Sequence, residues 1–163
     1  MTERFEKAYN ALLKAFMNDT LASGSCVACA VGNIIADAMG GVVYKNGSFH
    51  CSIDNEWWTN VFVTGSDGDQ TIYKVKDDEN IRVYRKRMFD LTGYKWHELA
   101  RIEKTFENNT KIKNPSYPLF SEHRIMEDQF NGLMAVMDVL IKLDKVEEGQ
   151  KYKNEFKNKL VKQ

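Results

Sequence analysis

Apolar residues recur every three or four positions through most of this chain, which is the spacing of helices that bury one face. The first such stretch runs over residues 2–18, where Thr2 can cap the start and the apolar positions are Phe5, Tyr9, Leu12 and Phe16. The same period predicts helices from just after Asp78 to about Leu91, over 96–107, over 122–143, and around Tyr152, Phe156 and Leu160.

The predicted helix over 122–143 is the longest and contains a glycine, Gly132, near its middle. Glycine inside a helix costs roughly 1 kcal/mol relative to alanine, and is usually tolerated where another backbone must approach closely. The apolar period of this helix assigns the following residues to the core: Met126, Phe130, Leu133, Met137, Leu140 and Ile141.

A further helix is predicted to begin at Ser25, whose hydroxyl can act as an N-cap, and to end at Gly40-Gly41. It would place Cys26 and Cys29 one turn apart on the same face. A thiol in the first turn lies near the positive end of the helix dipole, which favours the thiolate. Buried free cysteine is also common, so both residues can equally be part of the core.

The spacing changes after Gly41, where Val42–Lys45, Asn46-Gly47 and Ser48–Ile53 form a strong hairpin signal. An isolated hairpin is only marginally stable and must lie on the helices. We therefore predict a mainly α (α+β) fold: a compact helical domain of about six helices with a small β-hairpin insertion, spanning residues 1–163 as a single domain.

The charges balance, with 23 basic and 23 acidic residues among 163, so no overall field favours nucleic acid or an anionic membrane. The first residues lack the apolar segment of a signal peptide, and no stretch approaches a membrane span. Three cysteines, an odd number, favour a reducing compartment over a disulfide framework. We expect a cytoplasmic protein.

Zinc is the one cofactor that the sequence suggests, although none is required. Its ligands would be Cys26 and Cys29 with Cys51, and with His50 as a poorer choice, because neighbouring residues on a strand point to opposite faces. A fourth ligand could otherwise come from His97 or His123. Thiol redox chemistry at Cys26 and Cys29 is an alternative, but no strand precedes this pair as in a thioredoxin-like βαβ layout.

Other candidate sites are less specific. His97 with Glu98 and Glu103 could be an acid–base pair, but charged residues at the start and outer face of a helix are routine, and no nucleophile accompanies them. Trp57 and Trp58 could form an exposed binding patch or belong to the core. The sequence leaves enzymatic activity open and leans against it.

Three blocks of this chain resemble a family of short uncharacterised bacterial and bacteriophage proteins that often carry the name of the NADH-binding component of the Na⁺-translocating NADH-quinone reductase. The blocks are Cys26-x-x-Cys29 followed by Ala30–Ile34, Gly93–Phe106, and Phe130–Asp144. The true reductase component has a ferredoxin domain with C-x4-C-x2-C spacing, a flavin- and NADH-binding domain and a membrane anchor, none of which matches this chain. The resemblance implies only a phage or mobile-element setting, and that the helix with Cys26 and Cys29 is a feature of the family.

The leading expectation is a small accessory protein of phage type that acts by binding another macromolecule, in a host-modulating or inhibitor-like manner. We expect a protein partner, with no membrane and no indication of nucleic acid. Two alternatives stay open: a thiol or zinc protein using the helix that carries Cys26 and Cys29, and a virion-associated structural component.

Overall fold

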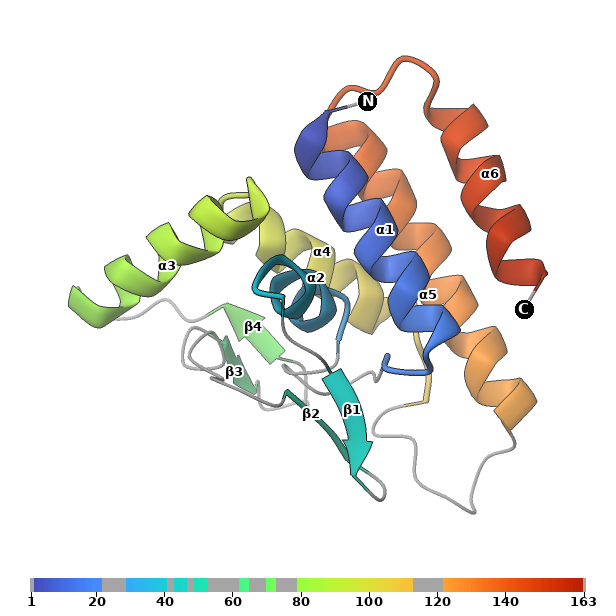
Figure 1. Ribbon diagram of the computed structural model, residues 1–163, viewed down its shortest axis with the longest axis horizontal. Coiled ribbons are helices and arrows are strands. Elements are labelled where there is room, and N and C mark those ends of the chain that lie inside the picture. The colour runs from blue at the N-terminus through green and yellow to red at the C-terminus, as the bar shows by residue number, and fades with distance from the viewer. Residues whose placement is uncertain are drawn as a thin grey trace.

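Six helices follow one another in the described part of the chain (Figure 1). The computed structural model describes residues 2–21, 29–40, 43–46, 49–52, 62–64, 70–72, 79–112 and 122–162. The helices are α1 (Glu3–Met17), α2 (Ala30–Ala38), α3 (Glu79–Thr92), α4 (Trp96–Asn108), α5 (Glu122–Leu143) and α6 (Gly149–Val161). Helices α1, α3, α4 and α5 lie within two residues of the predicted bounds, α6 contains the three predicted residues Tyr152, Phe156 and Leu160, and α2 starts later than predicted.

Local signals set several of the helix ends. The Thr2 side chain accepts a hydrogen bond from the Phe5 backbone N–H at 3.3 Å, so Thr2 caps α1 as predicted. Gly40 has φ +70° just after α2, a left-handed conformation that glycine adopts easily. Gly93 has φ +80° between α3 and α4, and a Cβ atom there would lie 2.8 Å from Cβ of Arg4. The turn between α3 and α4 can therefore lie directly on α1.

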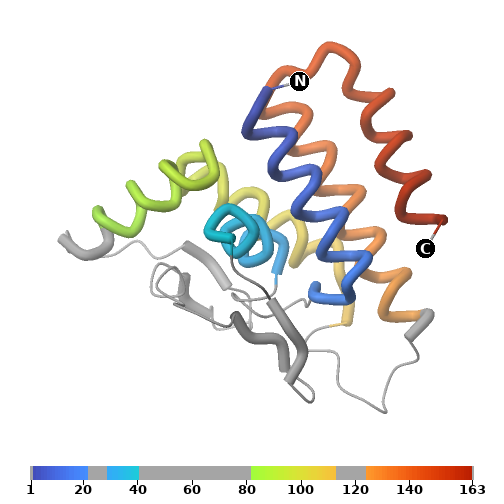
Figure 2. The backbone as a smooth tube through the Cα atoms, in the orientation of Figure 1, coloured from blue at the N-terminus to red at the C-terminus, as the bar shows by residue number. Residues whose placement is uncertain are grey.

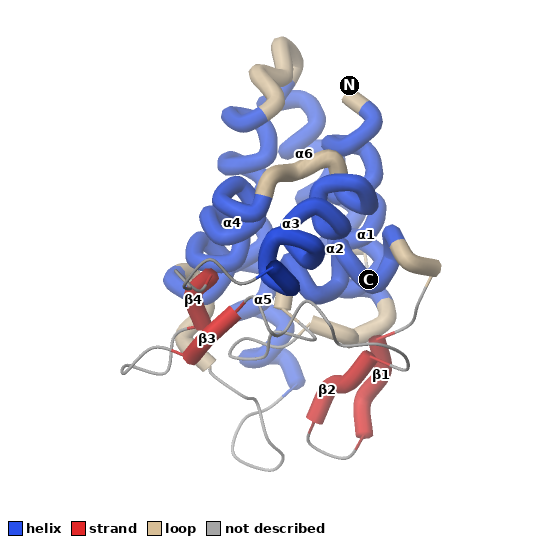
Figure 3. The backbone as a smooth tube through the Cα atoms, turned by 90° about the vertical axis from the view of Figure 1, so that its left-hand side faces the viewer, coloured by secondary structure: helices blue, strands red, loops and turns tan. Residues whose placement is uncertain are grey.

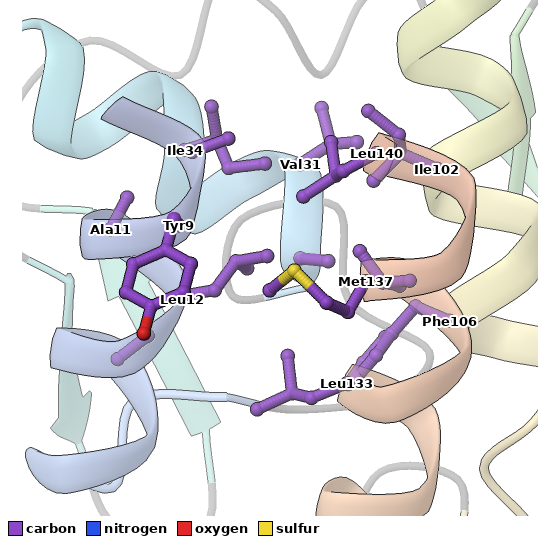
Figure 4. Packing of buried hydrophobic residues seen from close by; sticks show 14 of the residues in the cluster. Tyr9, Ala11, Leu12, Val31, Ile34, Ile102, Phe106, Leu133, Met137 and Leu140 are labelled. Atoms are coloured by element: carbon purple, nitrogen blue, oxygen red, sulfur yellow. The ribbon is translucent and has the colours of Figure 1, made fainter. Parts of the chain in front are cut away.

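The helices pack around one hydrophobic core. Helix α1 lies beside both α5 and α6, while α2 contacts α1, α3 and α4 (Figure 2). Side chains of α1 and α5 face each other across this core (Figure 4). Val31 of α2 and Phe106 of α4 belong to the same cluster. The largest fully buried side chains include Phe5, Leu12, Ile35, Met88, Tyr94, Leu99, Ile102, Phe106, Leu133 and Phe156.

The core prediction for α5 is mostly confirmed. Leu133, Met137 and Leu140 are buried, and Phe130 and Ile141 are partly buried against the same cluster. Met126 is 40 % exposed, so its assignment to the core was wrong. The N-terminal end of α5 extends beyond the end of α1 (Figure 1), which leaves the first turns of α5 with less cover than the apolar period suggests.

The predicted α+β fold class was wrong for the body of the molecule, which is an all-helical domain. Among the residues whose side chains are described, 79 % are helical and none lies in a strand. No β-hairpin forms part of this helical body. Among the described side chains, those of its hydrophobic core come from the six helices and their connections.

Short strands occur outside that body, in two antiparallel pairs, where only the backbone is described. Strand β1 (Val43–Asn46) pairs with β2 (Phe49–Ser52), and β3 (Phe62–Thr64) pairs with β4 (Gln70–Ile72). Asn46 lies opposite Phe49, so it belongs to the ladder and not to the predicted Asn-Gly turn. Figure 3 shows both pairs at the same end of the helices, and β4 lies beside α4.

Two-stranded ladders of three or four residues are marginal by themselves, so they do not define the fold class. Of the helices that the structure describes, none has both the length and the apolar content required to cross a membrane.

Candidate functional site

Cys29 is the N-cap of α2 and does not lie inside the first turn. Its backbone is extended, with φ −71° and ψ −177°, and its Sγ accepts a hydrogen bond from the Gly32 N–H at 3.2 Å. The helix therefore starts at Ala30, and the prediction of a start at Ser25 was wrong. Cys29 is 1 % exposed, and Cys26 lies outside the described residues. Cys29 therefore has a structural role, both as the N-cap of α2 and as a buried residue of the core.

Two buried amides fasten the chain on the N-terminal side of α2. Asn33 Nδ2 donates to the carbonyl oxygens of both Thr20 and Cys29 at 3.0 Å, and its Oδ1 accepts from the Thr20 hydroxyl at 3.0 Å. Gln129 of α5 donates from Nε2 to the Leu21 carbonyl oxygen at 2.6 Å. Residues 20–21, which follow α1, are therefore held against both α2 and α5.

Two carboxyl groups one turn apart on α4 are buried next to this region. Glu103 is 0 % and Glu107 is 2 % exposed. Neither carboxyl oxygen of Glu103 has a hydrogen-bond partner of good geometry among the described residues, although Cys29, Glu107 and the Val31 backbone lie near it. Burial, followed by the charge of Glu107, raises the pKa of Glu103 well above its usual range. Glu103 therefore favours its neutral form in the folded protein.

The acid–base pair that the sequence analysis considered for α4, and did not favour, does not form among His97, Glu98 and Glu103. His97 is exposed, with its ring 5.7 Å from the Trp96 ring, whereas Glu98 Oε1 accepts from Arg4 at 3.2 Å and from the Lys95 backbone N–H at 2.8 Å. Glu103 lies in the interior near α2. The structure therefore places these three side chains in different surroundings and does not bring them together.

The zinc prediction is not tested by the described side chains. His50 and Cys51 lie in β2, opposite Lys45 and Tyr44 of β1, and only their backbone is described. Cys26 lies outside the described residues, as do Trp57 and Trp58. Within the part of the chain that the structure describes, no three side chains of the ligand types His, Cys, Asp and Glu come together as a metal group. Zinc binding stays a hypothesis.

A buried charge network joins α1, α5 and the start of α4. Arg4 pairs with Asp144 at 2.5 Å, and the Tyr94 hydroxyl donates to the other carboxylate oxygen of Asp144 at 2.9 Å. The Arg4 guanidinium carbon also lies 4.4 Å from the centre of the Tyr94 ring. Burial and then the charge of Asp144 raise the pKa of Tyr94 far above its ordinary value, so Tyr94 remains a hydrogen-bond donor. All described partners in this network are residues of the chain itself, which indicates that the network has a structural role.

One described surface with two large exposed apolar side chains lies on α3. We define the α3 outer face as the exposed residues Arg82, Val83, Lys86, Arg87, Phe89 and Asp90. Val83 is 55 % and Phe89 is 46 % exposed, whereas Met88 on the other side of the helix is fully buried. Helix α3 lies on the opposite side of the molecule from α6 and extends away from the other helices (Figures 1 and 2).

The sequence interpretation missed this face, although a signal for it was present. The apolar stripe of the helix predicted Ile81, Tyr84 and Met88 as its inner side. Val83 and Phe89 do not belong to that stripe, and a helix with one buried face exposes large apolar residues placed outside it.

Comparison with known proteins identifies no relative: no family model, no curated protein and no solved structure matches this chain.

Proposed function

We propose that this protein acts by binding another protein through the α3 outer face. The observation that carries the proposal is the joint exposure of Val83 and Phe89 on a helix that projects from the body. Single exposed apolar residues are normal, but two large ones on one helix face offer the kind of apolar anchor on which interfaces depend.

The surroundings of these two residues support an interaction surface. Lys86 is three residues from both Val83 and Phe89, so its side chain emerges between them on the helix surface. Val83 and Phe89 are thus two apolar anchors with charged residues between and around them, and apolar anchors next to charged residues are common in protein interfaces. The opposite side of α3 is anchored by Met88, so the outer face is held in a fixed orientation.

The setting of the proposal comes from the resemblance described above. A phage-type accessory protein that works in the cytoplasm of its host cell would act by occupying a host protein. The same binding surface would also suit contact with another component of a phage particle, and the identity of the captured partner distinguishes these two settings.

The test is affinity purification of partners from the cells that produce the protein, followed by direct binding measurements with the purified partner. The variant Val83→Ser/Phe89→Ser should weaken binding by more than tenfold, because it removes the apolar anchors. Its matched control is Met17→Ser/Val161→Ser, which removes two apolar side chains that are 52 % and 66 % exposed on α1 and α6.

Equal loss of binding in both double variants, or none in the α3 variant, would refute the proposal. Thermal unfolding of each variant provides the necessary check on folding. All four substitutions remove exposed side chains, so we expect only small changes in the melting temperature.

A further inference from the structure

We propose that Cys29 and Glu103 are two ligands of a zinc-type divalent metal ion, held where the N-terminal end of α2 meets α4. This site differs from the α3 outer face and does not depend on the proposed function. Helix α2 lies beside α4 (Figure 1), and Cys29 and Glu103 are 1 % and 0 % exposed. Thiolates and carboxylates both bind zinc in proteins.

The carboxyl group of Glu103 is the observation that points to a ligand. Both of its oxygens are buried, and neither has a hydrogen-bond partner of good geometry among the described residues. A buried carboxyl group without partners is costly, so folded proteins usually supply a donor or a cation. A proton on Glu103 reduces this cost, because burial and then the charge of Glu107 raise its pKa well above the usual range. A bound cation would take the place of that proton.

The thiol of Cys29 is the second ligand, and it comes from the other helix. It lies close enough to the Glu103 carboxyl to act on the pKa of Glu103 as a hydrogen-bonding group. With Zn–S of about 2.3 Å and Zn–O of about 2.1 Å, two ligands of a tetrahedral zinc ion lie about 3.5 Å apart. This separation is close to van der Waals contact, so two neighbouring groups can share one ion.

Hydrogen bonds within α2 already orient the thiol. The Sγ of Cys29 accepts from the Gly32 N–H at 3.2 Å, and Asn33 Nδ2 donates to the Cys29 carbonyl oxygen at 3.0 Å. A backbone N–H donor at the start of a helix stabilises a thiolate, which is the form that binds a metal. Hydrogen bonds of this kind orient the ligands of metal sites.

The types of the ligands select the ion. A thiolate favours Zn²⁺, whereas Mg²⁺ and Ca²⁺ take oxygen ligands. Zinc takes four ligands, and the described residues supply these two, since no described group of three His, Cys, Asp or Glu side chains lies together. The sequence provides a further thiol, Cys26, at C-x-x-C spacing from Cys29. The full-length protein is therefore the material for the test.

The test is metal binding by the purified protein, stripped with a chelator and then titrated with Zn²⁺ or Co²⁺. After removal of unbound metal, elemental analysis should find about one ion per chain. Bound Co²⁺ should show the thiolate-to-cobalt charge-transfer absorption, which sites made only of oxygen and nitrogen ligands lack. Zn²⁺ should also raise the melting temperature, because it binds the folded protein.

Two variants remove the proposed ligands and keep the size of each side chain. Cys29→Ser and Glu103→Gln should each weaken Zn²⁺ binding by about tenfold or more, and Cys29→Ser should also reduce the charge-transfer absorption. Glu127→Gln, which removes an exposed carboxyl group from α5, is the matched control and should bind Zn²⁺ like the wild type. Thermal unfolding without metal checks that each variant folds.

The absence of bound metal above background in the wild-type protein would overturn the proposal. Binding that persists in both Cys29→Ser and Glu103→Gln would also overturn it, because the ion would then be held elsewhere. An equal loss of binding in Glu127→Gln would make the effect a general consequence of lost negative charge, and would count against the site as well. If Glu103→Gln does not fold, the wild type and Cys29→Ser still decide the question through the cobalt absorption.

Discussion

At Gly132, helix α5 lies directly against side chains from the C-terminal end of α4 and the residues after it. A Cβ atom at this position would lie 2.6 Å from Cγ2 of Thr110 and 2.9 Å from Cδ2 of Phe106. Phe106 is fully buried in a close-packed core, so its ring has little room to move. We expect Gly132→Ala to lower the free energy of unfolding by about 1–3 kcal/mol, measured by urea denaturation, because overpacking outweighs the helix propensity of alanine.

Asn131→Ala is the matched control for that substitution. Asn131 is the exposed neighbour of Gly132 on the same helix, so alanine there meets no crowding and should leave stability unchanged or raise it by a few tenths of a kcal/mol. Equal stabilities of the two variants would contradict the steric explanation.

Single residues also show what the sequence can reveal. The position of Gly132 within a strong helix pattern predicted the close approach of another backbone, whereas the atoms that crowd this position belong to the side chains of Thr110 and Phe106. The apolar period could not predict the exposure of Met126, because a period assigns a residue to a face and does not tell how far the neighbouring helices extend.

At the scale of an element, the start of α2 depends on the thiol of Cys29. Cys29→Ala removes the acceptor for the Gly32 N–H and should cost about 1–2 kcal/mol of stability. Cys29→Ser keeps an acceptor at the N-cap position and should cost less than the alanine variant. Thermal or urea unfolding of the two variants decides this, and a serine variant less stable than the alanine variant would argue against the capping role.

The sequence misplaced this helix start for a physical reason. Ser25 and Cys29 both offer a side-chain acceptor before an apolar run, and local propensity does not choose between them. In the structure the N-cap is Cys29. The Asn33 side-chain amide donates to the carbonyl oxygens of both Cys29 and Thr20. Such a contact between α2 and the connection after α1 cannot be inferred from the residues around Ser25.

The end of α5 is joined to α1 by the ion pair between Arg4 and Asp144. The side chains of Arg4 and Asp144 are 27 % and 1 % exposed, and Tyr94 donates to the same carboxylate. Asp144→Ala leaves the guanidinium and the buried Tyr94 hydroxyl without this acceptor, so we expect a loss of about 2–4 kcal/mol in the free energy of unfolding.

Asp138 provides the comparison for Asp144, because it also forms an ion pair from α5. Its partner is Lys153 at 2.7 Å, but the Asp138 side chain is 61 % exposed. Asp138→Ala should cost less than about 1 kcal/mol, since exposed pairs contribute little. If both substitutions cost the same in urea unfolding, burial of the Arg4 pair would not be the cause of its strength.

At the scale of the whole molecule, the sequence predicted the positions of the helices along the chain better than which of their faces are buried. Leu99, Ile102 and Phe106 form the buried stripe expected of α4. Glu103 was assigned to the outer face, but α4 lies between α2 and α5, so the side of the helix next to the stripe is covered as well. The arrangement of three helices determines this burial, and a pattern within one helix does not contain it.

The buried Glu103 links the stability of the whole protein to pH. Its pKa is raised in the folded protein above an ordinary value of 4.5, because of burial and then the charge of Glu107. Above about pH 4.5 the folded state therefore holds a proton that the unfolded chain releases. The contribution of Glu103 to stability must decrease as pH rises from that value, until Glu103 ionises in the folded state as well.

Glu103→Gln removes this titration while keeping the size of the side chain. The difference in free energy of unfolding between the wild-type protein and Glu103→Gln should therefore shift in favour of the variant as pH rises above about 4.5. Urea unfolding at several pH values measures it, with the exposed Glu127→Gln of α5 as the control. Parallel pH profiles for the wild type and Glu103→Gln would mean that Glu103 is not the group that binds the extra proton.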